Sequence, residues 1–413
     1  MLARLKGFKK LTSINEALSR FLDRLQPRKL ATVQISLKEA LGRVTAKNIN
    51  ATKDLPPYHR SAVDGYALRA IDTVGASPYQ PKDLRLVNKE LGGERELREI
   101  WTGNTLPKGA DSVVMLEHTE RIGNRIQILV SLTPGANVSR KGEDVKKGDV
   151  VVKAGLRLRP HHLGLLAALE NREVKVVRKP KVALLATGSE LAPLGAPLKP
   201  NQIVEVNSII LSELCSELGA ESFSLGIARD DEDEIRVRIC EGLAEADLII
   251  TTGGTSVGVH DLVPRVIEQI EPHALVAHGI AMRPGMPTAL AVVQRKPVLV
   301  LSGNPVAASV GFEVFARPTI LRFLGIKEEG RARLKAKLTR RVAGVLGRRV
   351  ILRVRVVEKD GDFLAEPIRI KGSSIITTMT KANGYVIIPE DREGLRENEV
   401  VMVHLFGTVR EEQ

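Results

Sequence analysis

The sequence predicts a chain of the class α/β plus β. We expect a central, mostly parallel α/β domain, a β-rich insert module and a C-terminal β-barrel-like domain. Three observations lead to this fold. From residue 178 to 326, apolar strand-like runs alternate with helical patterns, which is typical of βαβ units. Short β runs separated by Gly, Pro and Asn turns precede this region, and alternating strand patterns without helices follow Gly325.

The elements before the α/β domain are predicted from caps and turn residues. A helix over residues 13–24 begins at the N-cap Ser13, with Glu16 at the capping-box position. Pro56 and Pro57 end the next region, and short strands at 84–87, 112–116 and 126–130 then predict a small β-rich module. Pro160 begins a helix through residue 170, and a strand at 174–177 leads onward.

The α/β domain and the C-terminal domain follow from hydrophobic periodicity. Helices are predicted at 208–218, 232–244 and 262–270, and strands at 222–227, 248–250, 275–277 and 289–293. Period-two strands at 334–338, 350–357, 385–388 and 400–405 predict the β-barrel-like domain.

Composition excludes several classes of protein. The chain has 413 residues, of which 43% are hydrophobic and 27% charged, so it can bury cores and is not a disordered protein. No apolar run approaches the ~18 residues of a membrane-spanning helix, and the basic N-terminus lacks the apolar core of a signal peptide. Its two cysteines are far apart in sequence, which indicates a reducing compartment. We therefore expect a cytoplasmic enzyme without a membrane partner.

The net charge of +13 raises nucleic-acid binding as a rival interpretation. Residues 331–355 contain ten Lys or Arg and no acid. Apolar residues alternate with these cations, at Leu334, Ala336 and Leu338 and again around Arg353 and Arg355, which predicts strands with one face in water. Aromatic residues are only 3% of the chain, so base-stacking platforms are scarce. We therefore explain the positive charge mainly by solvated strand faces and not by nucleic-acid binding. Electrostatic steering of an anionic substrate is a lesser contribution.

The stretch 247–261 is the most informative motif. A short apolar run, 248–250, leads into a loop of Thr, Ser and Gly, and Asp261 follows just before a helical pattern. Glycines allow backbone N–H groups to turn toward an anion, and hydroxyls add further donors. The loop therefore predicts an anion cradle beside one carboxylate, which suits a phosphate ester with Mg²⁺.

The same pattern occurs at two other strands. Residues 182–186 lead into Thr187-Gly188-Ser189-Glu190, and residues 298–301 lead into Ser302-Gly303-Asn304-Pro305, with Pro305 as the first residue of a helix through Phe315. Three such loops predict a gathering at the carboxyl edge of one parallel sheet, where open α/β sheets bind ligands.

These motifs, together with Ser61-Ala62-Val63-Asp64-Gly65-Tyr66-Ala67 and Gly142-Glu143-Asp144, resemble the molybdopterin molybdenumtransferase family, to which the gephyrin E domain belongs. The matches run in family order from about residue 64 to residue 383. The resemblance implies a helix, 1–25, beside the α/β molybdopterin-binding domain, 178–326, and a C-terminal β-barrel domain, 327–413. It also implies an elongated connecting domain made of 26–55 and 146–177, with the β-rich module at 56–145.

The family reaction inserts molybdate, or tungstate, into adenylylated molybdopterin with Mg²⁺, and it releases AMP and molybdenum cofactor. The resemblance further implies a homodimer with a shared active site and contact with the molybdopterin adenylyltransferase. Two alternatives use the same α/β domain: an adenylyltransferase for molybdopterin and a non-catalytic molybdopterin-binding scaffold.

The resemblance carries roles to individual residues. It implies catalytic roles for Asp64, Thr102, Asp144, Glu190, Asp230 and Asp261, and Mg²⁺ binding by Glu190, Asp230 and Asp261. It implies substrate binding by Thr187, Gly188, Ser189, Gly253, Gly254, Thr255, Ser256, Gly258, Arg283, Ser302, Gly303, Asn304, Pro305, Ser373 and Ser374.

Plainer interpretations stand beside these roles. Glu190 could be an acid in the first turn of a helix, and Asp230 could be the N-cap of the next helix. Asp64 and Asp144 could shape turns, and the Thr102 hydroxyl could satisfy one.

Two positions depart from the family pattern. Ser139 stands where an arginine is common, with Arg140 and Lys141 nearby, and Met286 stands where a lysine is common. Arg283 keeps one cation in this segment, whereas Met286 cannot bind an oxyanion.

Overall fold

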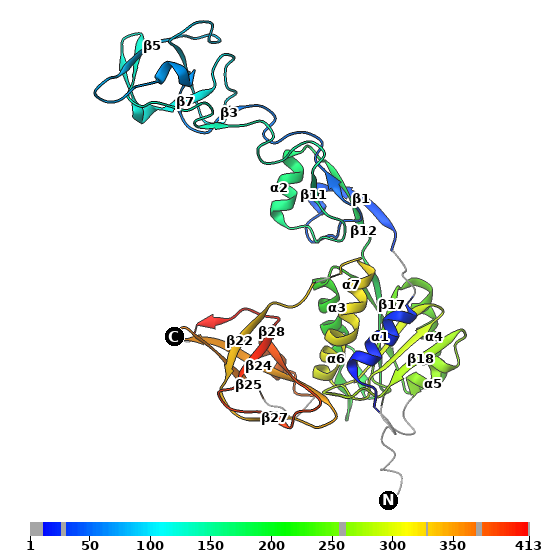
Figure 1. Ribbon diagram of the computed structural model, residues 1–413. Helices are drawn as coiled ribbons and strands as arrows, with labels where there is room; N and C mark the ends of the chain where they lie inside the picture. The colour runs from blue at the N-terminus through cyan, green and yellow to red at the C-terminus, as the bar shows by residue number, and fades with distance from the viewer. Residues whose placement is uncertain (1–10, 26–29, 256–261, 328, 369–373, 412–413) are drawn as a thin grey trace, which may run out of the picture. The chain divides into compact units, whose positions relative to one another are not determined.

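The computed structural model describes residues 11–25, 30–255, 262–327, 329–368 and 374–411 (Figure 1). The chain forms two compact units. Residues 34–176 make the inserted unit, and residues 1–33 with 177–413 make the main unit. The inserted unit therefore interrupts the main unit in the sequence. None of the helices in the described part of the chain combines the length and the apolar character of a membrane-spanning segment.

The main unit contains a six-stranded sheet that is mostly parallel. Its order is β16 (Glu221–Ala228), β13 (Lys181–Thr187), β17 (Leu248–Thr252), β21 (Lys296–Leu301), β20 (Ala289–Val293) and β18 (His273–His278). The first four strands are parallel, and β20 and β18 complete the sheet as antiparallel strands. The prediction of a mostly parallel sheet is confirmed.

Helices cover both faces of this sheet, and their bounds agree with the predicted periodicity. They are α3 (Asn207–Glu217), α4 (Glu232–Glu245), α5 (Leu262–Glu268) and α6 (Pro305–Gly311), which continues through a π-helical segment, Phe312–Ala316, into α7 (Arg317–Phe323) (Figure 1). Ile235 and Ile239 of α4 and Val263 of α5 pack in a buried cluster with strand residues such as Leu185. Pro305 occupies the first turn of α6, as predicted.

Helix α1 (Ile14–Arg24) packs against β18 and β20 of the same unit. Its N-cap is Ser13, whose Oγ accepts the N–H of Glu16 at 3.2 Å, as the capping pattern predicts. Thr12 pairs with Ile280, which fixes the start of the helix beside the sheet.

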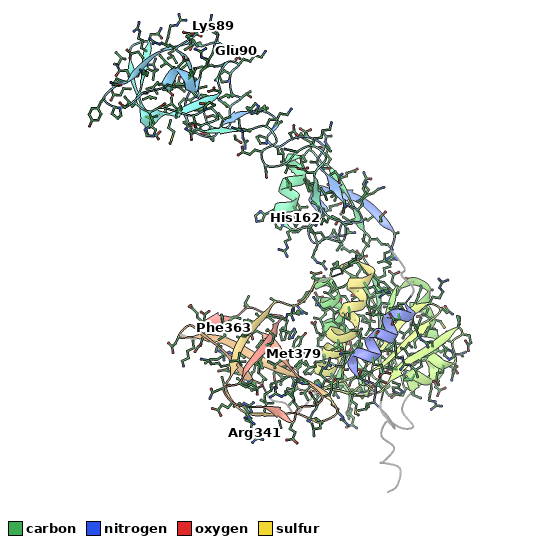
Figure 2. The ribbon with its side chains drawn as sticks, in the orientation of Figure 1. Lys89, Glu90, His162, Arg341, Phe363 and Met379 are labelled. Atoms are coloured by element: carbon green, nitrogen blue, oxygen red, sulfur yellow. The ribbon has the colours of Figure 1, made fainter. Side chains whose placement is uncertain are left out.

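The C-terminal region closes into a barrel. Five strands follow in the order β24 (Arg349–Lys359), β25 (Asp362–Pro367), β22 (Arg333–Leu338), β28 (Val400–Leu405) and β26 (Gly384–Ile388), and β26 pairs again with β24. Short pieces complete the region: β19 (Met282–Arg283), β23 (Val342–Ala343), α8 (Thr377–Thr380), β27 (Gly394–Leu395) and β29 (Arg410–Glu411). Figure 2 shows Phe363 and Met379 in this region, and Phe363 packs against the apolar core. The predicted β-barrel-like domain is confirmed.

One detail of the barrel was predicted wrongly. Lys335, Lys337 and Arg355 are exposed as expected, but Arg353 is only 3% exposed. The face of β24 that carries Ile351 and Arg353 borders a cavity of about 420 Å³, which Leu214 of α3 and Val310 of α6 also line. Arg353 is thus buried because the α/β part of the unit packs near this strand.

The inserted unit is rich in short strands. Its largest sheet has the order β7 (Ser112–Met115), β4 (Gly65–Leu68), β6 (Glu96–Ile100), β5 (Lys82–Leu86), β9 (Arg125–Ile128) and β8 (Thr119–Ile122). Smaller pairs join β1 (Thr32–Ser36) to β12 (Glu173–Val177), β2 (Ile49–Asn50) to β11 (Val150–Val152), and β3 (Arg60–Ser61) to β10 (Val138–Ser139).

The helix of this unit is α2 (Pro160–Ala168). At its start, the N–H of His162 donates to the carbonyl of Arg159 at 3.0 Å, and the Nδ1 of His162 accepts the N–H of Arg159 at 3.1 Å (Figure 2).

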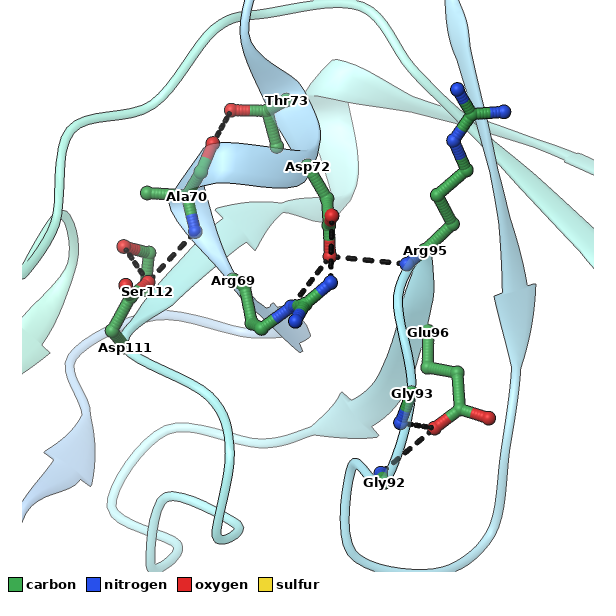
Figure 3. A network of polar contacts seen from close by, with 10 residues as sticks. All are labelled: Arg69, Ala70, Asp72, Thr73, Gly92, Gly93, Arg95, Glu96, Asp111 and Ser112. Atoms are coloured by element: carbon green, nitrogen blue, oxygen red, sulfur yellow. Dashed lines mark hydrogen bonds and ion pairs between the residues drawn. The ribbon is translucent and has the colours of Figure 1, made fainter.

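Buried carboxylates hold the loops of the β-rich sheet in place (Figure 3). Asp72 accepts two bonds from Arg69, each at 2.9 Å, and one from the N–H of Arg95 at 3.1 Å. Glu96 is 5% exposed and accepts the N–H groups of Gly92 and Gly93 at 2.9 and 3.0 Å. These backbone donors, led by Gly92, lower the pKa of Glu96, so the carboxylate stays charged and ties the loop to the strand.

Candidate active site

Three small-residue loops lie together at one edge of the α/β sheet. They follow β13, β17 and β21, which are neighbouring parallel strands, so their carboxyl ends meet at the same edge. The N–H of Gly253 donates to the carbonyl of Leu301 at 3.0 Å, and the Thr187 hydroxyl donates to the carbonyl of Thr252 at 3.3 Å. The predicted gathering of the loops is confirmed, and this edge is where such sheets bind ligands.

The loop after β17 requires glycine at two positions. Gly253 and Gly254 have φ values of +91° and +62°. A Cβ on Gly253 would lie 2.2 Å from the carbonyl oxygen of Thr187, and one on Gly254 would lie 2.6 Å from Cγ2 of Val263. No side chain therefore covers the backbone at these two positions, which suits the approach of an anion. Thr255 is 4% exposed, whereas Ser256, Gly258 and Asp261, which were also predicted here, lie outside the described residues.

Two carboxylates lie at the loop after β13. The N–H of Ser189 donates to Oδ2 of Asp230 at 3.0 Å, and the N–H of Asp230 donates to Oγ of Ser189 at 3.2 Å. The carboxylate of Glu190 lies over Gly188, where a Cβ would be 2.7 Å from its Oε2. Both side chains belong to exposed residues, so a ligand at the sheet edge can reach them.

The structure decides between the alternatives for these acids. Asp231, not Asp230, is the N-cap of α4, because its Oδ1 accepts the N–H of Glu234 at 2.8 Å. Glu190 is not a helix acid either, since the short strand β14 (Leu191–Ala192) follows it and pairs with β15 (Ile203–Val204). Neither plain interpretation therefore accounts for Asp230 or Glu190.

The third loop is fixed by α3 and α6. Ser302 is 7% exposed, and its Oγ accepts the N–H of Asn304 at 3.3 Å. Asn207 begins α3 and donates from Nδ2 to the carbonyl of Gly303 at 2.8 Å, while its buried Oδ1 has no partner among the described residues. No sequence motif pointed to Asn207, because it immediately precedes the helix predicted at 208–218 and lies outside every loop motif.

Two arginines meet where β19 pairs with the barrel. Arg283 is opposite Val350 of β24, and Arg283, Pro284 and Arg353 line one small cavity. Burial lowers the pKa of Arg353. The period-two pattern predicted a solvent-exposed Arg353, so the sequence did not indicate that this side chain is buried. Ser374 is exposed, and Ser373 lies outside the described residues.

The inserted unit holds the other predicted residues in one local structure. Asp64 Oδ1 accepts both the N–H and the hydroxyl of Thr102, each at 2.7 Å, and these two bonds lower the pKa of Asp64. The carboxylate of Asp64 and the hydroxyl of Thr102 therefore bond to each other and not to the backbone of their own turns. Gly65 beside them admits no side chain, since a Cβ would lie 1.8 Å from the carbonyl oxygen of Val114.

Asp144 belongs to the same local structure through the short strand β3. One edge of β3 pairs with Thr105, and the other edge pairs with β10, which leads on to Asp144. Asp144 is exposed and lines an open pocket with Arg60, Ser139 and Glu143. Ser139, where the family pattern has an arginine, therefore faces the same pocket as Asp144.

The donor set at the sheet edge suits a hard cation. In the described part of the chain, no group of three or more His, Cys, Asp or Glu side chains could hold a metal ion. Mg²⁺ binds through one or two carboxylates and keeps several waters, so Glu190 and Asp230 together supply a fitting donor set. Backbone N–H groups and hydroxyls beside these carboxylates suit a phosphate ester.

Three family models match successive parts of the chain. They are the MoeA N-terminal region (domain I and II) at residues 12–169, the "Probable molybdopterin binding domain" at residues 183–322, and the MoeA C-terminal region (domain IV) at residues 335–406.

Relatives extend over nearly the whole length. A molybdopterin molybdenumtransferase of Bacillus subtilis is 34% identical over 394 residues, which cover 92% of this chain and 90% of the relative. One from Staphylococcus aureus is 31% identical over 400 residues, which cover 95% of each. The crystal structure of the molybdopterin biosynthesis MoeA protein from Pyrococcus horikoshii has a TM-score of 0.84 and 33% identity, with coverage of 96% of this chain and 100% of that one. The resemblance read from the motifs is confirmed, and the chain belongs to the molybdopterin molybdenumtransferase (MoeA) family of molybdenum-cofactor biosynthesis.

Proposed function

We propose that this enzyme is a molybdopterin molybdenumtransferase. It joins molybdate to the dithiolene of adenylylated molybdopterin, cleaves the phosphoanhydride and releases AMP. The observation that carries the proposal is the sheet edge at which the loops after β13, β17 and β21 meet. Relatives that carry this activity in their names match over nine-tenths of the chain, which supports the same chemistry here.

Different groups of the loops bind the phosphate oxygens and the Mg²⁺ of the pyrophosphate. The N–H of Gly254 and the hydroxyls of Ser189, Thr255 and Ser302 donate to the phosphate oxygens. Glu190 and Asp230 hold Mg²⁺, which neutralises charge on the pyrophosphate. Asp261 is proposed as a third carboxylate from the sequence motif alone.

The oxyanion binds beside Arg283, the cation that this segment keeps at a partly exposed position. An arginine offers a planar set of donors that matches the oxygens of a tetrahedral anion. The same donors would accept tungstate, which has the same charge.

The site is completed across a homodimer. Asp64, Thr102 and Asp144 lie in the inserted unit, and the loop carboxylates lie in the main unit. We propose that each site combines the inserted unit of one subunit with the main unit of the other. We further propose that the enzyme works in the cytoplasm and receives its substrate from the molybdopterin adenylyltransferase.

A reconstituted assay tests the proposed function. Purified protein is given adenylylated molybdopterin, Mg²⁺ and molybdate, and both AMP and molybdenum cofactor are measured. We expect AMP release that requires molybdate and is lost with a chelator. AMP release that is the same with and without molybdate would contradict insertion of the metal.

A further inference from the structure

Trp101 is the sole tryptophan of this chain, and it is 52% exposed. It directly follows β6 (Glu96–Ile100), in the inserted unit. Single exposed apolar side chains are common on protein surfaces, so what distinguishes this indole is its setting.

A rigid turn presents this indole. The N–H of Asn104 donates to the carbonyl of Trp101 at 3.0 Å, and Gly103, the third residue of the turn, has φ +87°, as a type II turn requires. The turn is bonded to β3, since Gly103 donates to the carbonyl of Ser61 at 2.8 Å and Ser61 donates to the carbonyl of Asn104 at 3.0 Å. The backbone of Trp101 is therefore held in one position.

The second residue of the same turn is Thr102, which gives both of its donors to Asp64. The Asp64 carboxylate is thus bonded to Thr102, the residue that directly follows Trp101. A ligand that reaches Asp64 therefore lies next to the turn that carries the indole.

We propose that Trp101 is the stacking platform for a flat, fused heteroaromatic ring of the substrate. This inference rests on the proposed function, whose substrate carries two such rings, the adenine and the pterin. Either ring gains from stacking on an indole, and such stacking contributes a factor of about 5 to 150 in affinity, the equivalent of roughly 1–3 kcal/mol. The platform would orient the substrate in front of Asp64 and Thr102.

The single tryptophan makes the test direct. Indole fluorescence of the full-length protein, excited where tyrosine does not absorb, is followed during titration with AMP, with free pterin and with ribose 5-phosphate. We expect saturable quenching by AMP or by pterin, and the ring that quenches identifies the ring that stacks. Ribose 5-phosphate carries the phosphate without a ring and should leave the signal unchanged.

Variants separate stacking from other roles. Trp101→Ala should weaken binding of the quenching ligand about 5- to 150-fold by calorimetry, and Trp101→Phe should recover part of the loss. Tyr79→Ala is the matched control, because Tyr79 is 96% exposed on another turn of the same unit and should not change this affinity.

Three results would overturn the platform. They are no quenching by either ring, unchanged affinity and KM in Trp101→Ala, or a fluorescence change that depends only on protein concentration, which indicates a protein interface. In each of these cases, molybdate-dependent AMP release by the unaltered protein would keep the proposed function intact. Absence of that release would instead refute the proposed function itself.

Discussion

Asp64 and Thr102 show how one residue sets the charge of another. Both donors of Thr102 stabilise the ionised form of the Asp64 carboxyl and lower its pKa. Thr102→Val keeps the shape and the backbone donor but removes the hydroxyl, so the pKa of Asp64 should rise toward its ordinary value. Asp64 would then take up its proton at a higher pH.

The pH dependence of kcat/KM measures this change. In Thr102→Val we expect the acid limb to move to higher pH, whereas Thr102→Ser, which keeps the hydroxyl, should follow the unaltered enzyme. Acid limbs that coincide in all three proteins would show that Asp64 does not act as a carboxylate in the rate-limiting step.

Met286 is the second residue at which a single side chain should matter. It lies three residues after Arg283, in the segment that leads from β19 to β20. A hydrogen bond from a charged donor contributes roughly 1.5–3 kcal/mol, which corresponds to about a tenfold to hundredfold change in affinity. Met286→Lys should therefore lower the molybdate concentration for half-maximal activity and make binding more sensitive to salt.

The measurement is repeated with tungstate, because an added cation could favour either anion. Met286→Leu serves as the neutral control of similar size. Half-saturation points that stay unchanged for both anions in a folded lysine variant would place residue 286 outside the oxyanion site.

At the level of elements, neighbouring acids at the start of α4 have separate tasks. Asp231 caps the helix, and Asp230 bonds to the loop at Ser189. Asp231→Ala should lower the free energy of unfolding by about 1 kcal/mol with little change in turnover. Asp230→Asn should leave stability nearly unchanged but lower turnover strongly, because it removes a carboxylate from the proposed Mg²⁺ site.

Urea unfolding and AMP release measure the two effects on the same pair of proteins. The assignment would be wrong if the alanine variant lost activity without losing stability, or if the asparagine variant kept normal turnover at limiting Mg²⁺.

The elements themselves were largely predictable from the sequence, because hydrophobic periodicity and caps are local signals. The N-cap Ser13 and the start of α6 at Pro305 are examples. The return pairing of β26 with β24 was not visible in the same way, since closure depends on contacts between distant strands.

Side chains of the site were harder to predict than the loops that carry them. Arg353 obeys a period-two pattern, yet the outer face of its strand is buried. The sequence also did not show whether Asp230 or Asp231 caps α4, because both residues precede the same helix. Asn207 gave no sequence signal, since its contact with the loop at Gly303 depends on how α3 packs.

For the whole molecule, the proposed sharing of the site across a dimer predicts that two inactive variants restore activity when their subunits are mixed. Asp64→Ala removes a residue from the inserted unit, and Asp230→Ala removes one from the main unit. A mixed dimer has one site that contains neither change. After complete exchange of subunits, we expect about a quarter of full activity, because about half of the dimers are mixed and each has one intact site of two.

The control is the same mixture kept under conditions in which the subunits do not exchange. This control should stay inactive. No recovery after exchange has been confirmed by mass would show that each site lies within one chain.

The way in which the inserted unit leaves and rejoins the main unit has a consequence for the history of the protein. The N–H of Arg178 donates to the carbonyl of Ala31 at 2.9 Å, and β1 pairs with β12, so the two crossing points are neighbours. Paired strands are only about 4.7–4.9 Å apart, so a bridge of a few residues could replace residues 34–176 and cost little closure entropy. Insertion, deletion or exchange of a gene segment at these two points would add, remove or replace the inserted unit, which carries one half of the proposed site. The path of the chain through the α/β sheet would stay the same.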